Sequence, residues 1–283
     1  MRQLTSIDEI QAFVQEKRNG GCSIGFVPTM GALHEGHLSL VQESNGKNAI
    51  TIVSIFVNPT QFNNPEDLKK YPRTIDSDVK LLEEVGCDAV FIPEVATIYS
   101  DDFIPKKVDL GLLGETMEGF YRPGHFEGVV TVVQRLFSIV QPDSAFFGRK
   151  DFQQVAVIKQ MVESLKLDVK IYEVETKREE SGLAMSSRNM LLTEEEKIEA
   201  TIIYRILSMM LVNSKTKNPS EVQQIALESF EKSTLKIEYL EIVHPRTFER
   251  LETSWVKGAT VCVVAYCGKV RLIDNMEIIP LDK

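Results

Sequence analysis

The chain has 283 residues, of which 43% are hydrophobic and 26% are charged, as is normal for a folded globular protein. This length allows a large core and favours two domains over one. The formal net charge of −9 argues against a nucleic-acid-binding protein, which would show a basic bias or a basic stripe.

The first residues, MRQLTSIDEIQAFVQEKR, carry an amphipathic helical pattern that includes acidic residues. They lack the apolar region and cleavage site of a secretory signal, and no apolar stretch of the chain is long enough to span a bilayer. The four cysteines, Cys22, Cys87, Cys262 and Cys267, form neither a zinc pattern nor a disulfide framework. We therefore expect a cytoplasmic protein with free thiols in or near its core.

Apolar runs rich in β-branched residues alternate with helical patterns through the first part of the chain. SIGFVP precedes HLSLVQES, AITIVSIFVN precedes DSDVKLLEEVG, and DAVFIP precedes GVVTVVQRLFSIV; SAFFG, DFQQVAVIKQMVESL and DVKIYEVET continue the series. This order predicts an α/β fold with a doubly wound parallel sheet, covered by helices on both faces. Such a sheet binds ligands outside the carboxyl ends of its strands.

The pattern changes after Asn189. TEEEKIEATIIYRILSMMLV predicts one strong helix with Thr193 as its N-cap and acidic residues in its first turn. After a polar loop and another helix, LKIEYLEIV, ATVCVVAYCGKV and RLIDNMEIIPL predict a short antiparallel sheet. We expect a first domain over residues 1–183 and a smaller C-terminal α+β domain over residues 184–283.

The stretch PTMGALHEGH, Pro28 to His37, places two of the four histidines, His34 and His37, between a predicted strand and a predicted helix. HEGH lacks the H-E-x-x-H spacing of a zinc site, and no third ligand follows. One interpretation is a pair of exposed turn histidines. The other places both at a helix N-terminus, where they would hold phosphate oxygens as charge develops during phosphoryl or nucleotidyl transfer.

A second polar cluster, SIFVNPTQF, follows the next strand. Pro59 ends that strand, and Asn58 and Gln61 come beside it. Each is typical of a turn, but at the carboxyl edge of a parallel sheet their amides can read a hydroxyl or a carboxylate without adding charge.

Two more clusters fall at predicted strand ends. FFGRKDFQQ contains Lys150, which can meet a phosphate as a point charge, and Gln153 and Gln154, of which we expect one to be a solvated helix residue. ESGLAMSSRN is typical of a mobile loop, and its Arg188 supplies a forked donor for phosphate. The convergence of all four clusters on one sheet edge predicts a ligand site.

Other motifs are excluded by context. GCSIG matches the nucleophile elbow, but its Ser23 leads into a strand instead of a helix. Neither a P-loop nor a G-x-G-x-x-G fingerprint occurs, so a nucleotide site would need another construction.

Taken in order, PTMGALHEGH, SIFVNPTQF, YPR, RPGHFEGV, FFGRKDFQQ, GLAMSSRN and RLIDN closely resemble the pantothenate synthetase family, also called pantoate–β-alanine ligases. The similarity covers essentially the full chain. HEGH resembles the H-x-G-H signature of a wider nucleotidyltransferase superfamily with a Rossmann-like fold, and MSSR stands where related synthetases carry a lysine–serine loop.

The resemblance implies an ATP-dependent ligation. The carboxylate of (R)-pantoate attacks the α-phosphorus of ATP, which gives an enzyme-bound pantoyl adenylate and pyrophosphate. The amine of β-alanine then attacks the activated carbonyl, and pantothenate and AMP leave. The family also implies a homodimer, while the acidic charge balance and the lack of a membrane-spanning stretch lead us to expect no nucleic-acid or membrane partner.

The resemblance further implies residue roles. His34 and His37 would contact the ATP phosphates, with His37 at the proton-donor position, and Lys150 and Arg188 would share the phosphate charge. Gln61 and Gln154 match the pantoate-binding glutamines; Gln61 also borders the β-alanine position, and Asn58 would belong to the same pocket. The implied nucleotide-binding residues are Met30, Gly31, Ala32, Leu33, His34, Glu35, Gly36, His37, Gly148, Arg149, Lys150, Asp151, Lys177, Met185, Ser186, Ser187 and Arg188.

Within that set, Asp151 would accept from the ribose and the backbone of Lys177 would meet adenine. Mg²⁺ is expected with the triphosphate, because hard cations favour phosphate oxygens and water, and Asp78 and Glu118 are secondary candidates for positioning it. Arg149 stands where the family often has glutamate, and we expect its main chain to matter more than its side chain.

Three alternatives are weighed against this reading. A nucleotidyltransferase acting on a phosphate ester would need a basic pocket for a second phosphate, whereas Gln61 and Gln154 suit an uncharged polyol acid. An aminoacyl-tRNA synthetase is opposed by the acidic charge balance and by the lack of an RNA-binding domain. A non-catalytic nucleotide-binding module is opposed because each cluster retains its polar residues.

Overall fold

A computed structural model describes residues 1–100 and 103–278 and divides into two compact units. Unit 1 comprises Met1–Gly114, Glu118–Arg149 and Gln153–Glu175; unit 2 comprises Glu115–Met117, Lys150–Phe152 and Thr176–Lys283. The last boundary between the two units falls after residue 175. The domain boundary expected after residue 183 stays a prediction.

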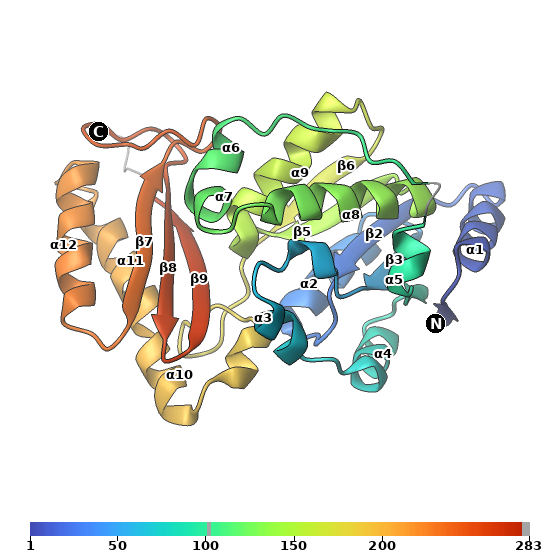
Figure 1. The fold of residues 1–283 in the computed structure, drawn as a ribbon, viewed down its shortest axis with the longest axis horizontal. Helices are drawn as coiled ribbons and strands as arrows, with labels where there is room; N and C mark the ends of the chain where they lie inside the picture. The colour runs from blue at the N-terminus through green and yellow to red at the C-terminus, as the bar shows by residue number, and fades with distance from the viewer. Residues whose placement is uncertain (101–102, 279–283) are drawn as a thin grey trace. The chain divides into compact units, whose positions relative to one another are not determined.

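Unit 1 is built on a six-stranded sheet with the order β1-β4-β3-β2-β5-β6, in which every neighbouring pair is parallel (Figure 1). Its strands are β1 (Arg2–Leu4), β2 (Ile24–Thr29), β3 (Ile50–Ile55), β4 (Ala89–Phe91), β5 (Ser144–Gly148) and β6 (Lys170–Val174). The predicted parallel sheet is confirmed.

The helical segments of this part of the chain fall between the strands. They are α1 (Ile7–Asn19), α2 (Glu35–Asn45), η1 (Pro59–Gln61), α3 (Pro65–Lys70), α4 (Ile75–Glu84), α5 (Val95–Ile98), α6 (Leu112–Glu115), α7 (Met117–Tyr121), α8 (His125–Val140), η2 (Arg149–Asp151) and α9 (Phe152–Ser164), where η marks a 3₁₀ helix.

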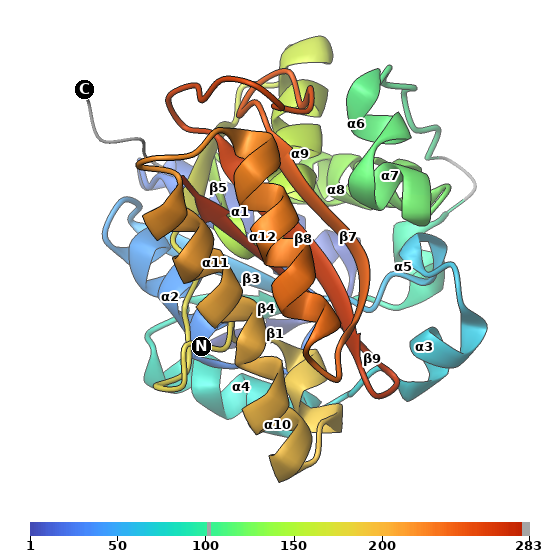
Figure 2. The same cartoon turned by 90° about the vertical axis from the view of Figure 1, so that its left-hand side faces the viewer.

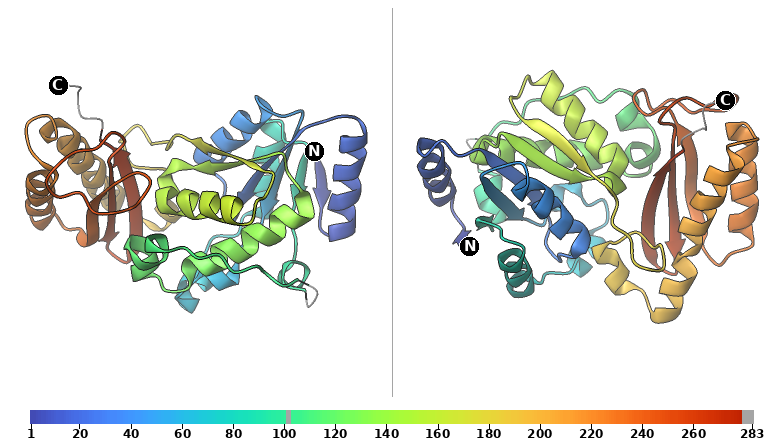
Figure 3. Two further views of the ribbon diagram at one scale, coloured as in Figure 1. Left: turned by 90° about the horizontal axis from the view of Figure 1, so that it is seen from above. Right: turned by 180° about the vertical axis from the view of Figure 1, so that it is seen from behind.

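Helices cover both faces of the sheet. Because successive side chains of a strand point to opposite faces, Phe26 and Val27 of β2 serve different layers. Phe26 meets Phe137 of α8 edge to face, with ring centroids 6.3 Å apart. Val27 belongs to a buried cluster with Val41 of α2 and Leu82 of α4. The left panel of Figure 3 shows α2 and α8 on opposite sides of the sheet.

Unit 2 carries the second sheet, which is antiparallel and three-stranded in the order β7-β8-β9. Its elements are η3 (Ser187–Leu191), α10 (Glu194–Ala200), α11 (Ile202–Asn213), α12 (Pro219–Glu231), β7 (Lys236–Val243), β8 (Thr260–Cys267) and β9 (Val270–Glu277). Apolar side chains of α11 and α12 form one buried cluster with the strands, and both helices lie against one face of the sheet (Figure 2). The predicted α+β organisation of this part is confirmed.

Two local expectations differ from the structure. The helical pattern at the N-terminus begins only at Ile7, because Arg2–Leu4 pair with Ala89–Phe91 as an edge strand. The single helix expected after Thr193 is interrupted at Thr201, whose hydroxyl donates to the carbonyl of Ile198 at 2.7 Å. Thr193 is the N-cap as predicted. The end of the run RLIDNMEIIPL, residues 279–281, lies outside the described residues.

The strand order places the first polar cluster at the centre of the unit 1 sheet. β2 lies between β3 and β5, and the chain builds outward from β2 in one direction before it returns to add β5 and β6. This is a topological switch point, where open α/β sheets bind ligands beyond the carboxyl ends of their strands. In the described residues no helix is both long and apolar enough to cross a membrane.

Candidate active site

The turn between β2 and α2 reverses the chain through two left-handed residues. Gly31 has φ +79° and Ala32 has φ +49°. A Cβ at Gly31 would meet Cγ2 of Ile55 at 3.0 Å and Oδ2 of Asp78 at 3.1 Å, so glycine suits both the backbone conformation and the space. The turn, Met30 to His34, delivers the chain directly into the first turn of α2.

Asp78, on α4, anchors this turn. Its Oδ2 accepts the backbone N–H of Ala32 at 3.0 Å, and its Oδ1 accepts that of Leu33 at 2.8 Å. The hydroxyl of Thr74 also donates to Oδ1, at 3.1 Å. Asp78 is only 1% exposed, so both oxygens of a buried carboxylate are occupied by donors of the protein itself.

The two histidines form a reciprocal cap on α2. Nδ1 of His34 accepts the N–H of Gly36 at 3.1 Å, and Nδ1 of His37 accepts the N–H of His34 at 3.3 Å. A ring nitrogen that accepts a hydrogen bond carries no proton, so a neutral ring at either position is protonated at Nε2. The ring centroids lie 4.1 Å apart, and both rings lie at the N-terminus of α2.

Gln61 reaches this turn from η1. Its Nε2 lies 2.9 Å from Sδ of Met30, and its Oε1 accepts from Asn58 at 3.2 Å. Both polar atoms of the Asn58 side-chain amide have partners within the protein. Nδ2 also donates to Gly128 O at 3.2 Å, and Oδ1 accepts from the hydroxyl of Tyr99 at 2.6 Å. Burial raises the pKa of Tyr99, which keeps its hydroxyl a donor. Gln61 and Asn58 thus share one buried hydrogen-bond network beside the histidine turn, and the ligand-binding role of Gln61 stays a prediction.

The motif RPGHFEG, to which the sequence assigned no role, holds Gln61 from behind. Nδ1 of His125 donates to the carbonyl of Gln61 at 2.9 Å, and Arg122 donates to the same oxygen at 3.2 Å. A Cβ at Gly128 would meet Thr60 O at 2.6 Å and Gln61 Cα at 3.0 Å, so α8 packs backbone to backbone against η1. Gly128 and His125 could have been singled out from the sequence of the motif. Their partner, Gln61 on η1, could not, because the sequence does not show which segment packs against α8.

The two adjacent glutamines of α9 have different surroundings. Gln153 is buried, accepts from the N–H of Glu118 at 3.0 Å and donates to Leu113 O at 2.9 Å. Gln154 is half-buried, and its amide makes no hydrogen bond within the described part of the chain. One of the pair was expected to be a solvated helix residue; Gln153 is the buried one and Gln154 is half-buried, and a ligand role for Gln154 stays a prediction.

At the end of β5, Gly148 faces open space. A Cβ there would meet no described atom within 4 Å. The parallel register of β2 and β5, with Phe26 opposite Ala145, sets the carboxyl ends of the two strands side by side. Arg149 directs its charge to β6 and beyond, where it pairs with Glu175 at 2.6 Å and lies 3.6 Å from Glu173.

Unit 2 gathers another group of predicted residues. Lys150, Ser186 and Arg188 line one small pocket, which Asp274 also borders. Ser186 caps η3 by accepting the N–H of Arg188 at 3.3 Å, while Ser187 is buried. Two cationic side chains and a hydroxyl therefore lie around one small void of about 10 Å³, together with the Asp274 carboxylate.

The remaining predicted residues of unit 2 lie close to that pocket along the chain. The N–H of Met185 donates to the carbonyl of Lys177 at 3.0 Å, so the two lie side by side on a short hairpin. Asp151 is half-buried, with its Oδ1 3.9 Å from Nζ of Lys150. Glu35, in unit 1, is exposed in the first turn of α2.

The secondary candidates for a metal do not fit that role. Asp78 has both oxygens in hydrogen bonds to the turn, and Glu118 is buried and paired with Arg122 at 3.2 Å. Within residues 1–100 and 103–278, no group of three or more His, Cys, Asp and Glu side chains is arranged to hold a metal ion.

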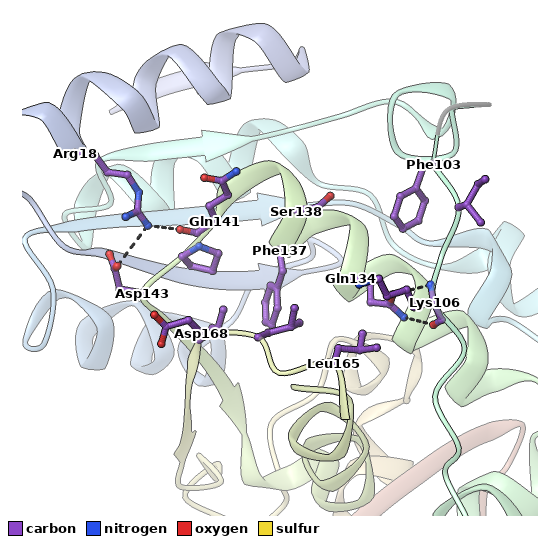
Figure 4. Close-up of a pocket in the computed structure, with 14 residues that line it drawn as sticks. Arg18, Phe103, Lys106, Gln134, Phe137, Ser138, Gln141, Asp143, Leu165 and Asp168 are labelled. Atoms are coloured by element: carbon purple, nitrogen blue, oxygen red, sulfur yellow. Dashed lines mark hydrogen bonds and ion pairs between the residues drawn. The ribbon is translucent and has the colours of Figure 1, made fainter. Parts of the chain in front are cut away.

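A pocket of about 470 Å³ lies at the other edge of the unit 1 sheet (Figure 4). Its walls include Phe137 of α8, Asp143 just before β5, and Leu165 and Asp168 before β6. Arg18 spans one side and pairs with Asp143 at 3.4 Å. Because these segments precede the strands, the pocket is at the amino edge, and none of the predicted ligand residues lines it.

The sequence model of the Pantoate-beta-alanine ligase family matches residues 2–277. The chain belongs to this family. A protein of Cytophaga hutchinsonii named pantothenate synthetase is 46% identical over 286 residues, which cover 99% of this chain and 100% of that protein. Another of that name, from Caldicellulosiruptor bescii, is 48% identical over 277 residues, or 96% and 97% of the two chains.

Solved structures of the same family have the same fold as this chain. Pantothenate synthetase from Thermus thermophilus superposes with a TM-score of 0.93 at 41% identity, over 99% of this chain and 100% of that one. Pantoate-beta-alanine ligase from Francisella tularensis, solved with a β,γ-ATP compound and β-alanine, gives a TM-score of 0.80 at 35% identity, over 98% and 97%. The expected parallel sheet with helices, followed by a smaller antiparallel C-terminal sheet, agrees with these neighbours.

Proposed function

We propose that this chain condenses (R)-pantoate with β-alanine to form pantothenate, with ATP converted to AMP and pyrophosphate. Membership in the pantoate–β-alanine ligase family over residues 2–277 supports the reaction class. The observation that carries the site assignment is the contact between Gln61 and Met30, because it sets a carboxylate-reading amide against the histidine turn.

In the first step, a carboxylate oxygen of pantoate attacks the α-phosphorus of ATP, and the bond to the β,γ-pyrophosphate breaks. His34 and His37 donate from Nε2 to phosphate oxygens on which negative charge increases, and the N-terminus of α2 adds its dipole. Gln61 and Gln154 orient the acid through its hydroxyl and carboxylate oxygens. Lys150 and Arg188 bind phosphate oxygens.

In the second step, the amine of β-alanine attacks the carbonyl carbon of the pantoyl adenylate. The bond from that carbon to the phosphate oxygen of AMP breaks, and the amine loses a proton as the amide forms. No side chain becomes covalently attached, which agrees with a site made of amides, imidazoles and cationic side chains.

We place Mg²⁺ on the phosphate oxygens and water instead of on protein carboxylates, because the oxygens of Asp78 are already occupied. Neither step forms or breaks a bond to the ion. We further propose a cytoplasmic homodimer that binds no nucleic acid; analytical ultracentrifugation of the purified protein tests the assembly.

The deciding experiment is a product assay with ATP, Mg²⁺ and (R)-pantoate, with and without β-alanine, that follows pyrophosphate, AMP and pantothenate. We expect about one enzyme equivalent of pyrophosphate without the amine, and AMP with pantothenate once the amine is added. Pyrophosphate release that is independent of pantoate, or no release at all, would contradict the ligase assignment. Nucleotidyl transfer to a phosphate ester is the second outcome to examine, since it uses the same histidine turn.

A further inference from the structure

The motif RLIDN has no role in the reaction described above, yet its Asp274 lies beside Lys150 and Arg188, to which the proposed function gives phosphate oxygens. Asp274 is on β9, its side chain is 4% exposed, and it borders the pocket lined by Lys150, Ser186 and Arg188. An unpaired carboxylate there would repel the phosphate oxygens that these residues attract, and a buried charge requires a partner.

Arg178 is that partner. Its Nη1 and Nη2 lie 2.6 Å and 3.0 Å from the two oxygens of Asp274, in a bidentate pair. The guanidinium also donates to Gly182 O at 3.1 Å and to Asn275 O at 3.3 Å, and it lies over the ring of Tyr204 at 4.6 Å. Its orientation is therefore fixed from several sides.

Arg178 belongs to the hairpin that leads into the phosphate-binding loop. It pairs with Ala184 as an antiparallel bridge, and the next rung joins Lys177 O to the N–H of Met185 at 3.0 Å. At the tip, a Cβ on Gly182 would lie 2.1 Å from the Tyr204 ring, so the hairpin has no room to shift toward α11. Fixing Arg178 on β9 therefore fixes the start of the Met185–Arg188 loop.

Asn275 extends the same support to Lys150. Its Nδ2 donates to the carbonyl of Lys150 at 2.8 Å, and its N–H donates to Oδ1 of Asp274 at 2.8 Å. Two successive residues of one strand thus hold the backbone of Lys150 and, through Arg178, the hairpin that carries Arg188.

We propose that Asp274 and Asn275 are positioning residues that set Lys150 and the Met185–Arg188 loop at the separation that a phosphate chain requires, with Arg178 neutralising Asp274. This inference rests on the proposed binding of ATP by Lys150 and Arg188. It does not depend on which acid or amine is joined.

The first test measures ATP binding by calorimetry, without pantoate or β-alanine, together with the KM values for all three substrates. Loss of the hydrogen bond to Lys150 O in Asn275→Ala should weaken ATP binding and raise the KM for ATP by about tenfold, with the KM values for pantoate and β-alanine within about twofold of wild type. Glu241→Gln, which breaks another β-strand ion pair, with Arg250, is the matched control and should leave ATP binding unchanged.

The second test uses Arg178→Ala alone and combined with Asp274→Asn. The single change leaves a carboxylate at the pocket without its cation and should weaken ATP binding by about a hundredfold, and the second change should recover about tenfold of that loss. A purely structural role for the pair predicts that the double variant regains free energy of unfolding without regaining ATP affinity, so urea unfolding is measured beside ATP binding.

The proposal is overturned if folded Asn275→Ala binds ATP like wild type, if all three KM values rise together, or if the double variant binds ATP no better than Arg178→Ala. If the wild-type protein binds ATP but forms no pantothenate, the proposed function is refuted. The ATP-binding measurements on the variants still test the positioning roles in that case.

Discussion

Oδ1 of Asp78 accepts the backbone N–H of Leu33 at 2.8 Å, so a carboxylate on α4 holds the turn that carries the histidines. In Asp78→Asn one acceptor becomes an N–H donor that faces another N–H. We expect the free energy of unfolding to fall by about 1–3 kcal/mol and adenylation to slow.

The control for this change is Asp76→Asn, an exposed carboxylate in the same helical turn, which should behave like wild type. Urea unfolding and pyrophosphate release measured over a range of Mg²⁺ concentrations separate two roles. An anchor leaves the Mg²⁺ dependence unchanged, whereas a weaker apparent affinity for Mg²⁺ in Asp78→Asn would identify a metal ligand.

His34→Ala and His37→Ala should each slow adenylation by about 10²–10³, because each removes one oriented donor to developing charge. Single-turnover pyrophosphate release measures this directly. His244→Ala is a matched control, since Nδ1 of His244 also caps a turn by accepting backbone N–H groups. Equal adenylation rates in wild type and both histidine variants would remove the histidines from the mechanism.

Gln154→Ala and its neighbour Gln153→Ala should fail in different ways. Gln154→Ala should weaken pantoate binding by about tenfold with normal stability. Gln153→Ala deletes two buried hydrogen bonds and should lower the free energy of unfolding by about 2 kcal/mol. Pantoate titration and urea unfolding of both variants check the assignment, which the reverse pattern would contradict.

Gly128→Ala should displace η1, because the new methyl group would lie 2.6 Å from Thr60 O. The strain costs about 1–3 kcal/mol and should raise the KM for pantoate more than that for ATP. Gly46→Ala, at the C-cap of α2, is the control for adding a methyl group to a glycine with right-handed helical dihedral angles, since its Cβ would make ordinary contacts at 3.6 Å and 3.7 Å. An unchanged KM for pantoate in Gly128→Ala would show that η1 adapts.

Burial raises the pKa of the Cys87 thiol from its ordinary value of 9.0 to about 12. Between these values the unfolded chain loses the proton that the folded protein keeps, so stability falls as pH rises above 9. The loss is about 1 kcal/mol at pH 10. Urea unfolding at pH 8 and pH 10 should show this loss in wild type and a correspondingly smaller one in Cys87→Ala; equal losses in the two proteins would contradict the shift.

The central strands and most helices were predictable because their apolar periodicity reports burial directly. Arg2–Leu4 was not predicted as a strand, because three residues are too few to show an alternation of apolar and polar side chains. The break at Thr201 was not predicted, because the apolar periodicity continues through it. The family resemblance supplied Gln154 in preference to Gln153. The different surroundings of the two glutamines could be seen only in the structure, because the hydrogen-bond partners of Gln153 lie on α6 and α7.

The supporting contacts of the site could not be read from the chain for the same reason. Asp78 meets the backbone of Leu33, and Asn275 meets the backbone of Lys150 from 125 positions away. A backbone acceptor or donor leaves no trace in the identity of its own residue. Gly128 differs, because there the missing side chain is itself the contact and the glycine is visible in the sequence.

The close contact between Gly128 and η1 has a consequence for engineering. It consists of main chain on both sides, so no side chain can be shortened there to move η1 and Gln61 relative to α8. The thioether of Met30, 2.9 Å from Nε2 of Gln61, can be shortened, and under the proposed function libraries aimed at new acids should begin at that residue.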